Sequence, residues 1–600
     1  MSSFIRQLVF TSLLCLLLTP GLAKLSAQTS PASREQARQA DTLIVNAKVY
    51  TVNSRQPWAE GVAIAGGKIL AVGNHREMER HRGEHTNVID AKGRLVLPGF
   101  TDCHIHFLEG ALSMGQVALD GTKDVPEIQE RVKKYAADHP GKGWVLGRGW
   151  TYDAFGAAAL PDKKYLDEIV PDRPVLLVGY DGHTYWANSR ALELAGITRD
   201  TPDPPNGTIV RDPKTGEPTG ALKEGASPLV ERVLPEPTHE EKLAALRQGI
   251  AAANHAGLVR VHALGSDTAG ALHDSRAFDE YEELRQKGLL TLRMYIAPFL
   301  DPQQGLTPEF VASMEALRKK YHDDMLSGGL VKIMLDGVVE SHTAAMIDPY
   351  ADDSSQRGRM FWDAEKYKAA VAELDRRGFQ VTSHAIGEGA VRLALDAYEQ
   401  AAKTNKTKHA RHRIEHIETV TAADIPRFGG LGVIASMQPL HAYPDADIDG
   451  VWARNAGPDR VTRAFAWQSI AKRGGRLAYG SDWPVVTLNP WEGLQNAVTR
   501  EDVNGKPTGG WVPNQRVSLG QAIEAYTLGA AFAGHREKTE GSLETGKLAD
   551  LIIVDQNVFE IDPLKIGKTQ VVLTMVGGKT VYQAPDPAGA AKPAAAGAAQ

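Results

Sequence analysis

Two histidines stand one residue apart at the end of an apolar segment. The segment LPGFTDCHIHF, residues 97–107, breaks at Pro98-Gly99 and then carries His104 and His106. In an extended strand alternate side chains point to the same face, so both imidazoles can reach one metal ion. The alternative is a pair of buried core histidines. The pair is half of a metal site, and later segments must supply the other half.

Three further candidate ligands stand near the ends of later predicted strands. His384 ends the run VTSH, His416 ends RIEH, and Asp482 follows LAYGS. Enzymes built on parallel barrels place their catalytic groups at the carboxyl ends of the strands. Each of these residues alone also fits a core or surface role, but four histidines and an aspartate at strand ends favour one shared site.

Lys332 is an unusual residue for its surroundings. It lies within GGLVKIMLDG, between apolar neighbours. A charged ammonium group buried there would bear a large desolvation cost, which lowers the pKa of a lysine. A neutral amine can react with carbon dioxide to form a carbamate, an oxygen ligand able to bridge two metal ions. The alternative is a lysine that pairs with Asp336 or reaches solvent.

The elements that must position these residues alternate between apolar runs and helical patterns. Their spacing is typical of βα units in a parallel barrel or a doubly wound sheet. Between residues about 110 and 250, the sequence is rich in Trp, Gly and Pro, which predicts an insertion rather than regular βα units. Short β patterns occur at both ends of the chain, with Gly66-Gly67 and Gly577-Gly578 at hairpin turns. We expect the two ends to form one small β-sandwich.

Composition limits the classes of partner. The chain has 600 residues, 42% hydrophobic and 23% charged, as in an ordinary soluble globular protein. Its net charge is -6, and the two signs are interspersed. Because no basic stripe or patch is present, we expect no nucleic-acid partner and no membrane surface. The expected partner is a small-molecule substrate; a homo-oligomer is compatible with the sequence, but no feature specifies it.

The two termini differ from the rest of the chain. Arg6 precedes the apolar run LVFTSLLCLLLTPGLA, which predicts a Sec-type signal peptide over residues 1–27, cleaved after Ala27 or Ala23. The run is too short for a comfortable membrane span, and an uncleaved anchor is the alternative. We therefore expect an exported protein, periplasmic or secreted, without a stable membrane anchor after cleavage. The Ala/Pro/Gly-rich tail, residues 585–600, is predicted to be disordered.

Several motifs together resemble the amidohydrolase superfamily. They are LPGFTDCHIH, VKIMLDG, SHAIGEGAV, RIEH, YGSDWPV and GSLETGKLADLIIVD. Within the superfamily the chain resembles the YtcJ-like amidohydrolases, which include N-substituted formamide deformylases, because DGHTYWANSRAL and PTGALKEGA match the insertion of that subgroup. The resemblance extends from about Asp41 to Tyr582.

The resemblance implies an α/β fold made of a barrel and a small β-sandwich. A metal-dependent hydrolase (β/α)8 TIM barrel is expected over residues 98–538, interrupted by the insertion at about 110–250. A small β-sandwich domain is expected from residues 40–97 and 539–584.

The resemblance also implies a binuclear metal centre. Two divalent ions, with zinc the favoured metal, would be held by His104, His106, Lys332, His384, His416 and Asp482. Lys332 would bridge the ions as a carboxylated lysine (a carbamate), and Asp482 would also be the general base. Substrate contacts, or else purely structural roles, are expected for His183, Glu224, Arg413 and His441.

The function that follows is hydrolysis of a carbon–nitrogen bond, other than a peptide bond, in a small amide or formamide-like molecule. Metal-activated water would attack, with Asp482 as general base. Ester or lactone hydrolysis, or deamination of a heterocycle, remains open for the same centre, because one fold hosts many reactions. A barrel that binds a ligand without turnover is a further alternative, against which the complete ligand set argues.

Overall fold

The computed structural model describes residues 38–585, except 142, 159 and 266–276. The signal peptide predicted at residues 1–27 lies outside the described residues, as does nearly all of the predicted tail. No helix in the described part is long and apolar enough to cross a membrane.

Parallel strands in two sheets form the centre of the fold. One sheet has the order β17-β16-β15-β8 and the other β18-β19-β20-β21-β22, and all neighbours within them are parallel. The strands are β8 (Phe100–Ile105), β15 (Leu258–Leu264), β16 (Arg293–Ala297), β17 (Leu326–Ser327), β18 (Leu330–Met334), β19 (Gln380–Ala385), β20 (Arg413–His416), β21 (Ile434–Met437) and β22 (Arg476–Tyr479). Helices connect them, so the predicted α/β class is confirmed.

Backbone hydrogen bonds link the two sheets at both edges. At one edge, Lys332 donates its N–H to the carbonyl of Pro298 (3.0 Å), and Leu300 donates to the carbonyl of Lys332 (2.8 Å). At the other edge, Asp482 donates its N–H to the carbonyl of His104 (2.7 Å). These contacts do not join the sheets into one continuous ladder, so a closed (β/α)8 barrel stays a prediction.

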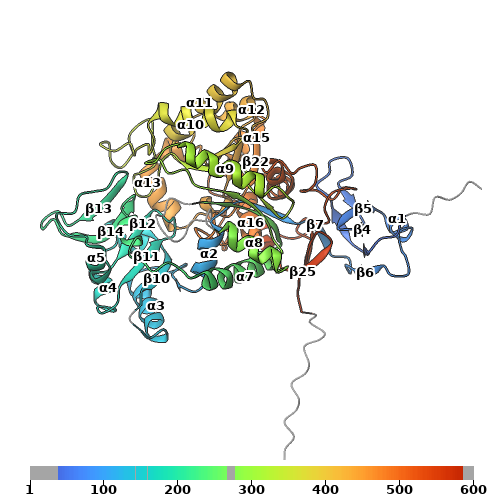
Figure 1. The fold of residues 1–600 in the computed structure, drawn as a ribbon, viewed down its shortest axis with the longest axis horizontal. Helices are drawn as coiled ribbons and strands as arrows, with labels where there is room; N and C mark the ends of the chain where they lie inside the picture. Colours follow the sequence, from blue (N-terminus) through green and yellow to red (C-terminus); the bar gives the residue numbers. More distant parts are fainter. Residues whose placement is uncertain (1–37, 142, 159, 266–276, 586–600) are drawn as a thin grey trace, which may run out of the picture. The chain divides into compact units, whose positions relative to one another are not determined.

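Helices follow or precede the parallel strands. The main ones are α7 (His239–Ala256), α8 (Phe278–Gln286), α9 (Pro308–Lys320), α10 (Ala364–Arg376), α11 (Glu388–Asn405), α12 (Ile425–Leu431), α15 (Trp467–Lys472) and α16 (Pro490–Thr499), with shorter α13 (Ala453–Ala456), α14 (Pro458–Val461), α17 (Leu519–Glu524) and α18 (Ala530–Ala533). Local chemistry sets their ends: Thr238 and Glu241 form a capping box at the start of α7, and Gly257 ends it with a φ of 90°. α10 and α11 lie side by side (Figure 1).

A separate six-stranded sheet lies in the segment for which the sequence predicts an insertion. Its order is β13-β14-β12-β11-β10-β9. The strands are β9 (Val117–Ala118), β10 (Val145–Trp150), β11 (Val175–Gly179), β12 (Thr184–Ala187), β13 (Gly207–Arg211) and β14 (Pro218–Glu224); the helices are α2 (Phe107–Ser113), α3 (Val125–Asp138), α4 (Lys164–Asp167), α5 (Ser189–Ala195) and α6 (Pro228–Glu231). Trp150, Tyr152 and Trp186 are buried in the same apolar cluster, so these aromatic side chains stabilise the insertion itself.

Strands from both ends of the chain share a sheet. Its order is β25-β24-β23-β7-β2-β3, beside a four-stranded sheet β5-β4-β1-β6. The strands are β1 (Thr42–Val45), β2 (Lys48–Tyr50), β3 (Trp58–Ala59), β4 (Gly61–Ala65), β5 (Lys68–Gly73), β6 (Asn87–Asp90), β7 (Leu95–Pro98), β23 (Leu551–Val554), β24 (Val571–Val576) and β25 (Lys579–Gln583), with α1 (His75–Glu79). Ile64 of one sheet and Ile553 of the other belong to one buried cluster. A separate sandwich domain with the predicted boundaries stays a prediction.

The two predicted hairpins are confirmed. β4 pairs with β5, and β24 with β25, both antiparallel. Gly66-Gly67 and Gly577-Gly578 connect them, with φ values of 59°, 75°, 55° and 74°. Two successive positive φ values are what a tight two-residue hairpin turn requires, and glycine adopts them without a steric penalty.

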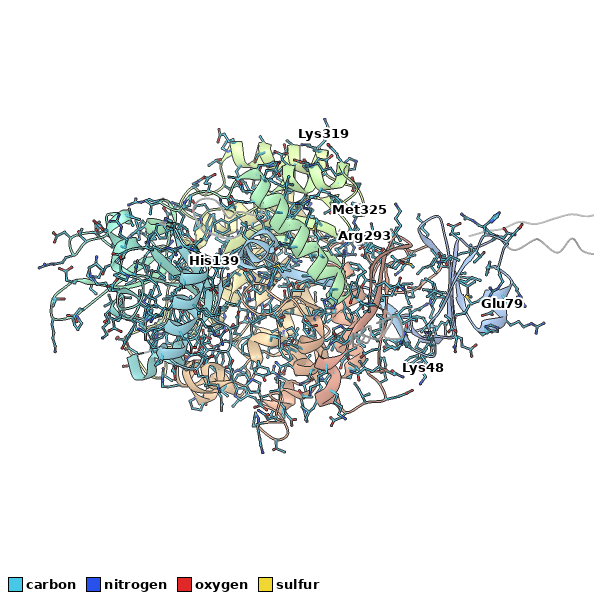
Figure 2. The ribbon with its side chains drawn as sticks, turned by 90° about the horizontal axis from the view of Figure 1, so that it is seen from below. Lys48, Glu79, His139, Arg293, Lys319 and Met325 are labelled. Atoms are coloured by element: carbon cyan, nitrogen blue, oxygen red, sulfur yellow. The ribbon has the colours of Figure 1, made fainter. Side chains whose placement is uncertain are left out.

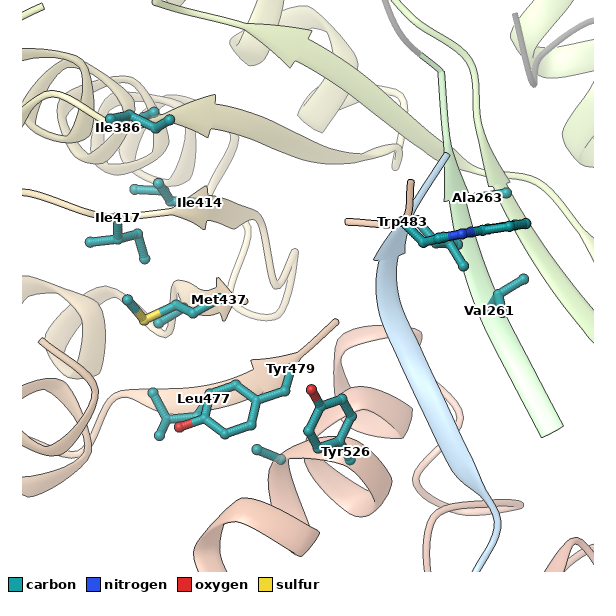
Figure 3. Close-up of a cluster of buried hydrophobic side chains, with 14 of the residues drawn as sticks. Val261, Ala263, Ile386, Ile414, Ile417, Met437, Leu477, Tyr479, Trp483 and Tyr526 are labelled. Atoms are coloured by element: carbon teal, nitrogen blue, oxygen red, sulfur yellow. The ribbon is translucent and has the colours of Figure 1, made fainter. Parts of the chain in front are cut away.

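A large hydrophobic core supports the parallel strands. Figure 3 shows part of it, where Ile414, Met437 and Leu477 come from the successive strands β20, β21 and β22. Trp483, the residue after Asp482, belongs to the same cluster. The loop that carries a predicted ligand is therefore anchored by packing.

A buried ion pair joins the parallel strands to the sheet that is built from N-terminal and C-terminal strands. Arg293 of β16, labelled in Figure 2, contacts Asp550 through Nε–Oδ2 (2.8 Å) and Nη2–Oδ1 (2.9 Å). Their side chains are only 4% and 6% exposed. Asp550 also accepts the N–H of Gly577 (2.6 Å), so it links β16 to the C-terminal hairpin.

We expect the substitution Asp550→Ala to lower the free energy of unfolding by about 3–5 kcal/mol, because it leaves the buried guanidinium of Arg293 without its partner. Urea denaturation of the purified chain measures this. The matched control is Glu560→Ala, which removes an exposed ion pair with Lys48 (side chains 60% and 47% exposed) and should leave the unfolding midpoint in place. Equal midpoints for the two variants would contradict this role.

Candidate metal centre

The residues predicted as metal ligands gather at the carboxyl ends of the parallel strands. They are His104 on β8, His106 directly after it, Lys332 on β18, His384 on β19, His416 on β20 and Asp482 after β22. His416 and Asp482 have φ values of 71° and 63°. Non-glycine residues adopt this region at an energetic cost, and such residues cluster at functional sites.

Asp482 is the point on which the imidazoles converge. Its Oδ1 lies 3.1 Å from Nε2 of His104 and 3.1 Å from Nε2 of His106. This buried oxygen nevertheless has no partner with hydrogen-bond geometry among the described residues. One ligand atom each from His104, His416 and Asp482 can be chosen within 4.8 Å of one another. Nitrogen and oxygen donors that converge in this way fit a divalent metal ion such as zinc.

Hydrogen bonds on the far side of the rings orient three of the imidazoles. Nδ1 of His104 lies 2.8 Å from Glu415, Nδ1 of His106 lies 3.0 Å from the carbonyl of Leu264, and Nδ1 of His416 lies 2.8 Å from Gln438. An acceptor at Nδ1 favours the tautomer whose Nε2 is free to bind a metal. His384 differs, because its Nε2 lies 3.3 Å from the carbonyl of Gly337.

Two of the candidate ligands, His384 and His416, favour the neutral form. Burial lowers the pKa of His384 well below its usual value, and the charges of His183 and Lys332 add to the effect. Burial and the neighbouring His384 lower the pKa of His416 in the same way. The neutral imidazole is the form that binds metals.

Asp482 itself stays ionised. Burial alone would raise its pKa, but His104, His106 and His416 outweigh that effect and hold the pKa well below the usual value of 3.8. An ionised carboxylate can serve both as a metal ligand and as a proton acceptor.

Glu415 is a functional candidate that the sequence did not single out. Its side chain is fully buried. Its Oε2 lies 2.8 Å from Nδ1 of His104, and its Oε1 lies 3.3 Å from Nε of Arg413. Thr382 also donates its hydroxyl to this carboxylate. Burial would raise the pKa of Glu415, but Arg413 and His104 outweigh it and hold the pKa at about 2. The only sequence signal was the pair of charged residues in the short strand RIEH.

Arg413 lies behind the ligands, away from the wall of the cavity described below. It is fully buried, and its Nη1 donates to the carbonyl of Cys103 (3.3 Å) and contacts Nδ1 of His262 (2.8 Å). This placement gives Arg413 a role in holding Glu415.

Lys332 is buried, as its apolar neighbours predict. It is 2% exposed, and its Nζ lies 3.3 Å from Nε2 of His104. The alternative partner, Asp336, is engaged elsewhere: its carboxylate accepts backbone N–H groups of Ala345, Ile386 and Gly387. Lys332 is therefore among the ligand candidates and can reach the same ion as His104.

The ligands open into a small cavity, here called the inner cavity, of about 80 Å³. His106, Lys332, His384, His416 and Asp482 line it, as do three of the residues predicted to contact substrate, His183, Glu224 and His441. The structure thus brings metal-ligand and substrate-contact candidates together, except Arg413.

The insertion supplies one wall of the inner cavity. His183 places its Nδ1 2.8 Å from Glu224, and its ring centroid lies 5.4 Å from that of His384. Glu224 also accepts the hydroxyl of Thr343, which comes from the long segment after β18. Two contacts therefore fix the carboxylate that orients His183.

The lining of the inner cavity also contains another imidazole and two acidic side chains. His441 stacks on His416 with a centroid distance of 5.5 Å and an interplanar angle of 7°. Glu418 accepts from Trp452 Nε1 (2.7 Å), and Glu340 accepts from the hydroxyl of Tyr180 (2.8 Å). Burial and the carboxylate of Glu418 raise the pKa of Glu340 well above its usual value, which favours the protonated form of this side chain.

Comparison with known proteins identifies the family of the chain. Residues 87–582 match the model of the amidohydrolase family. The putative amidohydrolase YtcJ of Bacillus subtilis (strain 168) is 29% identical over 537 residues, which cover 89% of this chain and 98% of the relative. The N-substituted formamide deformylase of Arthrobacter pascens is 27% identical over 554 residues, with 90% and 98% covered.

Two further similarities cover most of the chain. Protein LONG AFTER FAR-RED 3 of Arabidopsis thaliana is 34% identical over 544 residues, which cover 90% of this chain and 92% of the relative. The crystal structure of an uncharacterized metal-dependent hydrolase from Pyrococcus horikoshii OT3 aligns with a TM-score of 0.67 at 25% identity, covering 87% of this chain and 99% of that one. Together with the family match over residues 87–582, these similarities show that the chain belongs to the amidohydrolase family, as its motifs predicted.

Proposed function

We propose that the protein is a metal-dependent hydrolase that cleaves a carbon–nitrogen bond in a small amide or formamide-like molecule. The observation that carries the proposal is the convergence of buried imidazoles on the carboxylate of Asp482, whose Oδ1 is 3.1 Å from two Nε2 atoms. Membership of the amidohydrolase family and the similarity to an N-substituted formamide deformylase support the choice of bond.

The proposed centre holds two divalent ions, with zinc favoured by the imidazole and carboxylate donors. The ligands are His104, His106, Lys332 as a carbamate, His384, His416 and Asp482. Bound there, the metal would polarise the substrate carbonyl and bring the pKa of water toward neutrality.

The chain's own residues handle the proton. Asp482 accepts a proton from the attacking water and returns it to the leaving nitrogen, which must be protonated before the carbon–nitrogen bond breaks. The products are a carboxylic acid and an amine. His183, held by Glu224, contacts the reacting carbonyl from the insertion, and His441, stacked on His416, lines the same cavity.

Reaction class is tested with a substrate panel. Purified protein is incubated with formamides, N-acyl amino acids, esters, lactones and amino-heterocycles, and each product is identified by mass spectrometry. Turnover of an amide or formamide supports the proposal. Turnover of only an ester or lactone, or release of ammonia from a heterocycle, would assign the alternative reaction.

We expect about two transition-metal ions per chain in the purified protein, because a binuclear clamp serves this kind of hydrolysis. Elemental analysis measures the ions. His104→Ala should abolish both metal and activity, whereas the control His139→Ala, at an exposed residue of the insertion, should keep both. Full activity after chelation would contradict a metal-dependent reaction.

Glu415→Gln should weaken metal binding about 10- to 100-fold, because the uncharged amide orients His104 less firmly. Metal affinity is measured by competition with a chelator. The matched control is Asp375→Asn, which alters another buried carboxylate that contacts a histidine, His412 (3.1 Å), outside the site. Equal metal affinities in the two variants would show that Glu415 does not support metal binding.

A further inference from the structure

A second and much larger cavity adjoins the inner cavity. This outer cavity measures about 860 Å³, against about 80 Å³ for the inner one. Four residues border both: Arg148, Tyr180, Pro484 and Val485. The inner cavity can hold only a few atoms beside the ligands, so the bulk of a larger substrate must lie in the outer cavity.

The position of Asp482 decides which part of the substrate points outward. Pro484 and Val485, in the shared border, directly follow Asp482 and Trp483 along the chain. Asp482 returns the proton to the leaving nitrogen, so that nitrogen must approach its carboxylate. The nitrogen side of the substrate therefore faces the shared border, and the acyl side faces the ligands.

The outer cavity has a wall suited to an apolar group. Its apolar lining includes Met114, Val117, Leu440, Val486 and Leu564. Burial of alkyl or aromatic surface against such a wall is favourable in proportion to the area removed from water.

The charges around the outer cavity disfavour an anion. Its ionisable lining residues are Asp120, Asp445, Glu492, Glu501, Lys568 and Arg148. Arg148 is already paired with Glu109 (2.9 Å). A carboxylate on the substrate would therefore meet more negative than positive charge.

We propose that the outer cavity binds the nitrogen substituent of the substrate, that this substituent is apolar and not anionic, and that the inner cavity takes a formyl-sized acyl group. The inference rests on the proposed carbon–nitrogen hydrolysis. In that reaction water adds to the carbonyl carbon, the carbon–nitrogen bond breaks, and one proton of the water goes to the nitrogen, giving formic acid and the free amine. The amine leaves through the outer cavity.

Three formamides on the metal-loaded protein test this assignment. They are N-methylformamide, N-(3-methylbutyl)formamide and N-formylleucine, which is the 3-methylbutyl compound with an added carboxylate. We expect kcat/KM to rank the 3-methylbutyl compound above both others. Val486→Trp, which narrows the outer cavity, should reduce the preference for 3-methylbutyl over methyl about tenfold, the scale on which apolar pockets discriminate. Val88→Trp, at a 36% exposed position of β6, is the matched control and should leave the preference unchanged.

A second variant is used in case Val486→Trp does not fold. Leu564→Trp, at another apolar residue of the outer cavity, should also reduce the preference. An unchanged preference in a folded Val486→Trp or Leu564→Trp protein, or faster turnover of N-formylleucine than of its uncharged match, would overturn the assignment.

Binding of the product separates this inference from the reaction itself. Affinity for 3-methylbutylamine is measured by calorimetry on the same metal-loaded proteins. Suppose that no formamide is hydrolysed, but that Val486→Trp weakens amine binding and Val88→Trp does not. The proposed reaction is then wrong, and the assignment of the outer cavity as the binding site is supported. If the amine binds all three proteins equally or does not bind, the outer cavity is not the site.

Discussion

One carboxylate that faces two imidazoles across the edge between β22 and β8 is the constraint on which the rest of the site depends. Asp482 lies 3.1 Å from both His104 and His106, and the three side chains are 6%, 0% and 15% exposed. A backbone hydrogen bond from Asp482 to His104 (2.7 Å) holds the two segments together. Buried charges are costly unless they are compensated. The fold supplies the geometry, and a bound cation would supply the compensation.

Behind this contact three polar side chains follow one another. Arg413 is followed by Glu415 at 3.3 Å, and Glu415 by His104 at 2.8 Å. In a medium of low polarity neighbouring polar contacts strengthen one another, so the network acts as a unit. The orientation of His104 therefore depends on Arg413, although this guanidinium does not line the inner cavity. A change in Arg413 would act on the centre through two intermediate side chains.

The sequence predicted the strand ends better than the contacts between them. Strand alternation places His104 and His106 together, and the glycine pairs identify both hairpins. Glu415, in contrast, contacts a residue 311 positions away. A pattern of apolar runs indicates that strand ends share an edge, but it does not tell which charged side chains face each other across it. For the same reason the sequence leaves Arg413 open between a substrate contact and a structural role, since a charged residue at a strand end fits the cavity wall and the space behind it equally well.

The substrate side of the centre has a different origin from the ligand side. The ligands stand on or beside parallel strands that bury their apolar residues in one large core. His183 is instead held by Glu224 of the insertion, which in turn accepts from Thr343 of the segment after β18. Because loops and insertions change more readily than a packed core, this arrangement allows the wall that meets the substrate to vary while the ligands stay in place. Selectivity among substrates would then depend in part on how the insertion and this segment meet, separately from the ligands on the strands.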